Sequence, residues 1–229
     1  MKYKIDEHFY FLLFLGIYHL FFVFISFEYV TKNGGDSFLY WFQTESTQHK
    51  SWLDFFNYGT DAVLFLNYLF AKVLSIPFFF GFVLYALIGF FGFVQLYRLA
   101  LRMMNKTGMP KATKYLLYTF LLLPNTHFWT ALIGKEAIIF AALSTLFLKV
   151  YQQKFTAVGC ILSFLIILVV RPHLAFMGLF TLLVVLLFSS KISFKQKTIS
   201  VASILTLLFI TFYMFKLFGN IMNLIPAKI

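Results

Sequence analysis

Long apolar runs, separated by short polar segments, repeat along most of the chain. A helix needs about 20 mainly apolar residues to cross the hydrocarbon core of a bilayer. On this basis the pattern predicts an all-α fold, a polytopic transmembrane helical bundle of about seven spans. Residues 1–229 are expected to form a single integral membrane domain, because no soluble domain interrupts the runs. The predicted spans are residues 9–29, 77–97, 115–133, 134–151, 155–170, 174–190 and 198–216.

The longest polar interruption, residues 30–76, is predicted to be a loop on the outer side of the membrane. Gly34 and Gly35 predict a turn just after the first span. The later stretch "DAVLFLNYLFAKVL" is mostly apolar but carries Asp61, Asn67 and Lys72. It is too short and too polar to cross easily, so we expect this outer loop to contain interfacial helices.

The apolar stretch between residues 115 and 151 contains a break whose form the sequence leaves open. One alternative is a helix that kinks at Pro124 and turns at Gly134. The other is a helix that stops near Pro124, followed by a new helix from about Trp129, which the intervening Asn-Thr favours as a helix-start signal. In the second alternative, Lys135 and Glu136 lie about two turns into the new helix, roughly 10 Å from its start.

Composition requires a lipid environment for this chain. Its 229 residues are 61% hydrophobic and only 12% charged, and the mean hydropathy is +0.86. Soluble domains are about 45–50% apolar and about 25% charged, so a water-soluble fold of this size cannot bury so much apolar surface. The single cysteine, Cys160, excludes an intrachain disulfide and cannot support a thiolate metal cluster. No metal site and no cofactor is expected.

The net charge of +11 would suggest a nucleic-acid partner in a soluble protein. Here most lysines and arginines fall in short loops that share one side of the predicted membrane. By the positive-inside rule this places the N-terminus in the cytoplasm and argues against a nucleic-acid partner. All acidic residues except Asp6 and Glu7 then fall on the outer side, which concentrates carboxylates on that face.

Two outer turns carry charges within apolar surroundings. A charge at the membrane centre costs about 2.5–3.5 kcal/mol, so Lys135 and Glu136 are expected to face protein or a wet cavity. Arg171 follows a predicted span of about 24 Å, shorter than the hydrocarbon core of about 30 Å. Pro172 should force Arg171 towards extended geometry and make a corner between helices, with His173 just beyond it.

Three outer turns together predict a site for a lipid-linked phosphate. The lysine and arginine can bind a phosphate or pyrophosphate, and one carboxylate can act as general base on an acceptor hydroxyl. A position at the lipid boundary implies a substrate with an apolar tail, as in a polyprenyl-linked sugar. The candidate catalytic residues are Asp36 and Glu136, and the candidate residues for binding the lipid phosphate are Lys135, Arg171, His173 and His127.

The chain resembles the GT-C type of multi-pass membrane glycosyltransferases, which use lipid-phosphate-linked sugars. The resemblance lies in the acidic residue of the first outer loop, Asp36 in "GGDSFLYW", and in the interfacial helices after it. The pattern "LLPNTHFWTALIGKEA" followed by "VVRPH" also looks like bacterial envelope-polysaccharide proteins. The resemblance implies a polyprenyl-linked sugar donor, Asp36 as catalytic base, and a place in the bacterial inner membrane.

Other interpretations of the same residues stay open. Lys135 and Glu136 are also explained by a lysine reaching the interface and an acid stabilised by a helix N-terminus. Asp36 is an ordinary residue after a Gly-Gly turn. The alternative functions are a polysaccharide polymerase or ligase, and a non-catalytic membrane subunit or transporter-like component of an envelope complex. The expected partners are the polyprenyl-linked donor and membrane lipid, with a second membrane protein as a further candidate.

Overall fold

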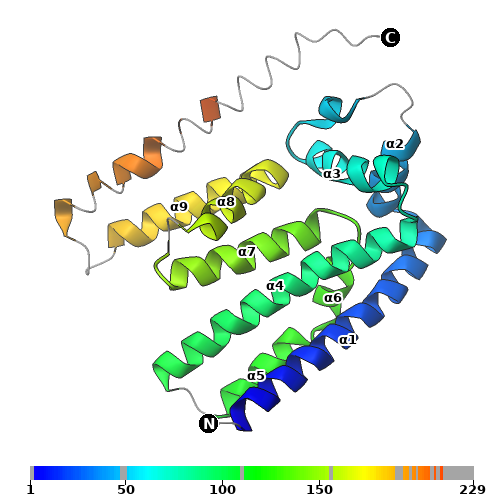
Figure 1. The fold of residues 1–229 in the computed structure, drawn as a ribbon. Coiled ribbons are helices and arrows are strands. Elements are labelled where there is room, and N and C mark those ends of the chain that lie inside the picture. The colour runs from blue at the N-terminus through cyan, green and yellow to red at the C-terminus, as the bar shows by residue number, and fades with distance from the viewer. Residues whose placement is uncertain are drawn as a thin grey trace. The chain divides into compact units, whose positions relative to one another are not determined.

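The regular secondary structure is all helical and no strand occurs in the residues that the computed structural model describes. They are residues 3–46, 51–108, 111–154 and 157–188, with 193–195, 198–199, 201–206, 209 and 212–213. The chain divides into two compact units, Met1–Pro172 and His173–Ile229. Figure 1 shows the helices of the first unit, which holds most of the chain.

Two helices of the first unit are long and apolar enough to cross a membrane. They are α1 (Tyr3–Asn33) and α4 (Phe78–Thr107), and they pack against each other. α4 continues past the predicted limit at residue 97 and ends at Gly108, whose φ of 61° gives the left-handed conformation common at helix C-termini. These helices are consistent with a membrane protein, as the composition predicts.

The region after α4 forms three shorter helices with two breaks. α5 is Lys111–Leu121, α6 is Pro124–Thr130 and α7 is Lys135–Tyr151. α6 and α7 meet at an angle of 111°, so they form a sharply bent pair that counts as a third candidate span only if it is taken as one unit. The prediction of a helix start near Trp129 is wrong: Pro124 begins α6, because its fixed φ suits the first helical position.

α7 packs between α4 and α8 (Val158–Val170), as Figure 1 shows. α8 is apolar, but at 13 residues it is shorter than a span. The second unit contains α9, Pro172–Phe188, of which Pro172 itself belongs to the first unit. The predicted span at 198–216 falls largely outside the described residues. The helical class is therefore confirmed, whereas a bundle of about seven spans is not.

The predicted outer loop folds into short helices, as its sequence pattern indicates. α2 (Asp36–Ser46) follows the Gly34–Gly35 turn, in which both glycines have positive φ, 72° and 128°. Next come a 3₁₀ turn, α3 (Thr60–Asn67) and a π-helical turn at Tyr68–Val73. Trp41 of α2 lies over α4 at Gly81, where a Cβ atom would lie 2.5 Å from the indole ring. The glycine thus lets α2 approach α4 closely.

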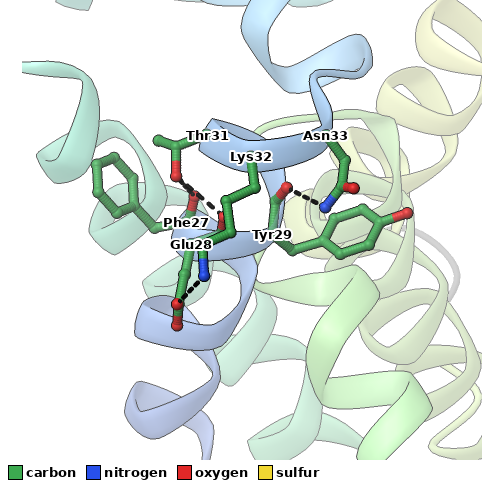
Figure 2. Close-up of polar contacts among 6 residues, drawn as sticks. All are labelled: Phe27, Glu28, Tyr29, Thr31, Lys32 and Asn33. Carbon is green, nitrogen blue, oxygen red and sulfur yellow. Dashed lines mark hydrogen bonds and ion pairs between the residues drawn. The ribbon is translucent and has the colours of Figure 1, made fainter.

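Polar contacts within the last turns of α1 fix its end before the Gly34–Gly35 turn (Figure 2). Lys32 Nζ donates to Glu28 Oε1 at 2.6 Å, and Asn33 Nδ2 donates to the Tyr29 carbonyl at 2.8 Å. Thr31 Oγ1 lies 2.9 Å from the Phe27 carbonyl, to which it donates. Glu28 therefore forms an ion pair within its own helix.

Candidate functional site: an ionic cluster at the ends of four helices

Four helix ends meet in the first unit where the predicted outer residues lie. The first turn of α2 joins the turn before α7, because the buried Ser37 hydroxyl donates to the Ile133 carbonyl at 2.8 Å. The start of α3 joins the end of α8, because the Gly59 N–H donates to the Val169 carbonyl at 2.8 Å. A third hydrogen bond, from Lys135 of α7 to Thr60 of α3, links the two pairs, so the beginnings of α2, α3 and α7 and the end of α8 lie in one region.

A buried hydrogen-bond network holds α2 against α3 and α4. Asn67 Nδ2 donates to the Tyr40 carbonyl at 3.2 Å, and the Tyr85 hydroxyl donates to Asn67 Oδ1 at 2.8 Å. All three residues are buried. A buried amide whose donor and acceptor are both satisfied fixes the helices it joins, because opening the network would leave polar groups without partners. Tyr40 is thereby held at a defined place beside the ends of α7 and α8.

The central interaction of the cluster is an ion pair between Glu136 and Arg171. A guanidinium nitrogen of Arg171 donates to Glu136 Oε1. Arg171 has φ −142° and ψ 78°, so α8 ends before Pro172 as predicted, but ψ lies below the extended range of about 120–160°. Both side chains are about one-third exposed, 33% for Arg171 and 38% for Glu136. The pair is therefore open to solvent on one side.

Lys135 and Glu136 are the first two residues of α7, rather than lying two turns inside a helix as predicted. The chain breaks after Thr130 and is extended at Gly134, so α7 begins later than the Asn-Thr signal predicts. Glu136 thus lies in the first turn, where the helix dipole stabilises a carboxylate. Lys135 Nζ donates to Thr60 Oγ1 at 2.9 Å, which ties α7 to the start of α3.

Tyr40 connects the remaining members of the cluster. Burial raises the pKa of the Tyr40 hydroxyl, and the negative charges of Asp36 and Glu136 raise it further, whereas a hydrogen bond with Thr60 and the charge of Arg171 lower it. Each of these groups is therefore near enough to act on Tyr40. A Cβ atom on Gly134 would lie 2.9 Å from Glu136 Oε2 and 3.8 Å from Tyr40 Cε2, so the Glu136 carboxylate lies close to the ring.

The structure thus gathers three of the six predicted site residues around Tyr40 within the first unit, Asp36, Glu136 and Arg171, and places a fourth, Lys135, against Thr60. Asp36 is exposed in the first turn of α2. His173 is exposed and belongs to the second unit, which is described by itself. Among the described residues, no group of three or more His, Cys, Asp or Glu side chains could hold a metal ion.

His127 is placed elsewhere. It is fully buried, and its Nδ1 lies 2.9 Å from Nδ1 of His19 in α1. Its Nε2 donates to the Leu121 carbonyl at 2.7 Å. The sequence grouped His127 with Lys135 because both were expected near one outer turn, but the break at residues 131–134 and the 111° bend separate their surroundings. His19 also contacts α4, because its Nε2 lies 2.9 Å from the Ala86 carbonyl oxygen.

Three participants were missed by sequence reasoning. Tyr40 carries no motif and is one of 13 tyrosines. Ser37 looks like an ordinary turn residue. Thr60 had a weak signal, because a Gly59-Thr60-Asp61 sequence before an apolar run is typical of a helix start.

Comparisons with models of protein families, with curated proteins and with solved structures give no match to this chain.

Proposed function

We propose that this chain is an integral membrane glycosyltransferase that takes a sugar from a polyprenyl-phosphate donor at the outer face of a bacterial inner membrane, in envelope glycan assembly. The observation that carries the proposal is the gathering of Asp36, Glu136 and Arg171 around Tyr40, with Lys135 hydrogen-bonded to the neighbouring Thr60. Two carboxylates and two cations beside apolar helices supply a base and phosphate ligands at the edge of the lipid.

Asp36 is the base in this proposal. It is exposed, whereas Glu136 is engaged with Arg171. The Asp36 carboxylate takes the proton from an acceptor hydroxyl, whose oxygen attacks the anomeric carbon of the sugar. A new glycosidic C–O bond forms, and the bond between that carbon and the phosphate oxygen breaks. The leaving group is polyprenyl phosphate, which carries away the bonding electron pair.

The two cations meet the charge of the leaving phosphate. Lys135 uses one N–H for Thr60 and has two more that a phosphate can accept. Arg171 presents a planar fork of five donors, of which Glu136 occupies a part. Glu136 therefore orients the guanidinium, a positioning role rather than that of a base. His127, which is buried against His19, has no part in the reaction.

The test is sugar transfer by the full chain reconstituted in liposomes. The donor is a radiolabelled polyprenyl-phosphate hexose, and the product is followed by its separation from the donor lipid. Asp36→Asn is expected to reduce turnover by about 10²–10⁴-fold, the usual contribution of a general base. Glu28→Gln is the matched control, because Glu28 is an exposed acid paired with Lys32 in α1; its turnover should equal that of the parent.

Two results would overturn this proposal. Equal turnover in Asp36→Asn and the parent would exclude Asp36 as base. A parent chain that transfers no sugar from any of a panel of polyprenyl-phosphate hexoses, but restores transfer when added to a second membrane protein, would instead support a non-catalytic subunit.

A further inference from the structure

A second cluster of titratable groups lies inside the first unit and takes no part in the proposed reaction. His19 of α1 and His127 of α6 are 1% and 0% exposed. Their Nδ1 atoms lie 2.9 Å apart, which is a hydrogen-bond distance. The two histidines are 108 positions apart in the sequence, so their contact joins helices that are distant along the chain.

The other nitrogen of each ring contacts a backbone carbonyl. His19 Nε2 lies 2.9 Å from the Ala86 oxygen of α4, and His127 Nε2 lies 2.7 Å from the Leu121 oxygen at the end of α5. A carbonyl oxygen only accepts, so each Nε2 must carry a hydrogen and donate it. Both rings therefore use an N–H on the side facing away from the partner histidine.

The three hydrogen bonds of the pair need more N–H hydrogens than two neutral rings have. A neutral imidazole has one N–H, so two neutral rings have two, and both are used by the carbonyls. The Nδ1–Nδ1 contact needs a third hydrogen, since two bare lone pairs at 2.9 Å repel each other. We infer that His19 and His127 form a proton-binding site, which holds one shared proton between the two Nδ1 atoms and carries one positive charge when all three hydrogen bonds are made.

The surroundings suit a delocalised cation. The ring of Phe93 stacks on His127 with centroids 4.2 Å apart and planes 8° apart, and it meets His19 edge-on at 5.3 Å. An aromatic face attracts a cation held against it, most strongly where water is excluded. Gly89 of α4 keeps the site tight: a Cβ atom there would lie 2.4 Å from the Thr130 carbonyl and 3.2 Å from His19 Nε2.

Apart from the two histidines themselves, no acidic or basic side chain in the described part of the first unit hydrogen-bonds to either ring. The titratable neighbour is Tyr18 of α1, whose ring meets His127 edge-on at 4.8 Å and whose hydroxyl donates to the Leu122 carbonyl at 3.2 Å. From α4 and α5 the pair meets aromatic rings and carbonyls. The proton is thus held by the pair itself rather than by a carboxylate counter-ion.

Loss of the shared proton changes the packing of three helices. Either the Nδ1 atoms move apart, which loosens α1 from α6, or one ring turns and leaves a buried carbonyl unpaired. α6 leads through residues 131–134 into Lys135 and Glu136 of α7. Proton binding at the pair is therefore coupled to the anchoring of the helix that precedes the ionic cluster. This inference does not depend on the proposed function.

The test is nuclear magnetic resonance of the full chain in detergent micelles, with ¹⁵N in the histidine rings. Spectra are taken from about pH 8 to about pH 4, which brackets the ordinary titration of histidine. As the pH falls, one low-field proton signal should appear that is coupled to both Nδ1 nuclei. The two rings together should then carry three nitrogen-bound protons. The inference would be overturned if each ring kept a single N–H proton throughout, or if each ring separately became an imidazolium with two N–H protons.

Variants show which of the five histidines of the chain give the shared-proton signal. His19→Gln and His127→Gln should each abolish the shared-proton signal completely. His8→Gln is the matched control, since His8 lies on the same helix and Nδ1 contacts the Tyr97 hydroxyl at 2.6 Å; it should leave the signal unchanged. A signal that survives in His19→Gln would also contradict the inference. The parent spectra remain decisive where a variant fails to fold.

Discussion

Arg171 forms an ion pair with Glu136, across 35 positions of the chain. The contact joins the end of α8 to the first turn of α7, and it lies beside Tyr40 of α2. Each residue stands at a helix end in an apolar sequence, Glu136 in the first turn of α7 and Arg171 just after α8. The pair therefore links the charges of these two turns, and its strength can be measured.

A double-mutant cycle with Glu136→Gln and Arg171→Gln should give a coupling free energy of about 1 kcal/mol, the upper part of the range for partly exposed pairs. The measured quantity is the free energy of unfolding in detergent. The matched control is Glu28–Lys32, whose side chains are 66% and 69% exposed; an i,i+4 pair of this kind should give about 0.3–0.5 kcal/mol. A Glu136–Arg171 coupling below that of the control would contradict the contact.

Gly134→Ala should displace the Glu136 carboxylate, because the new Cβ atom would lie 2.9 Å from Oε2. The backbone at Gly134 is extended, so the substitution itself adds no backbone strain. Its cost in unfolding free energy should shrink in a Glu136→Ala background, where the clashing side chain is gone. Gly178→Ala serves as the control, since a Cβ atom at that helical position meets nothing within 4 Å. Equal costs in both backgrounds would show that the carboxylate lies elsewhere.

Ser37→Ala should destabilise the fold by about 1–3 kcal/mol, because it leaves the Ile133 carbonyl without its buried donor. Thr31→Ala provides the comparison: its exposed hydroxyl bonds only within α1, and its effect should stay within about 0.5 kcal/mol. Both are read from chemical unfolding curves. Similar small losses in the two variants would mean that the start of α2 is not tied to the turn before α7.

The sequence predicted the helical class because apolar periodicity and length are local properties. The first span, the helix from Phe78 and the end of α8 before Pro172 all follow from such local signals. The form of the break after Leu121 does not follow from local sequence signals. Pro124 starts a short helix there, and the four residues 131–134 then turn the chain by 111°, a result of packing against α1 and α4 that no dipeptide signals.

The charged residues of the candidate site could be predicted from the sequence, but the contacts between them could not. Asp36, Lys135, Glu136 and Arg171 stand out because charge is rare in this chain. Tyr40 could not be recognised, since its role depends on a buried network with Asn67 and Tyr85 of two other helices. His127 is close to Lys135 in the sequence, but its buried contacts are with His19 and the Leu121 carbonyl.

The most direct test of the cluster is the pKa of the Tyr40 hydroxyl, followed by ¹³C-tyrosine magnetic resonance and assigned with Tyr40→Phe. Because nearby negative charge disfavours tyrosinate and positive charge favours it, the pKa should fall in Asp36→Asn and in Glu136→Gln and should rise in Arg171→Gln. Glu28→Gln should leave it unchanged. Three shifts with these signs would place residues of α2, α7 and the end of α8 around one ring, whereas an unchanged pKa in all three variants would contradict the cluster.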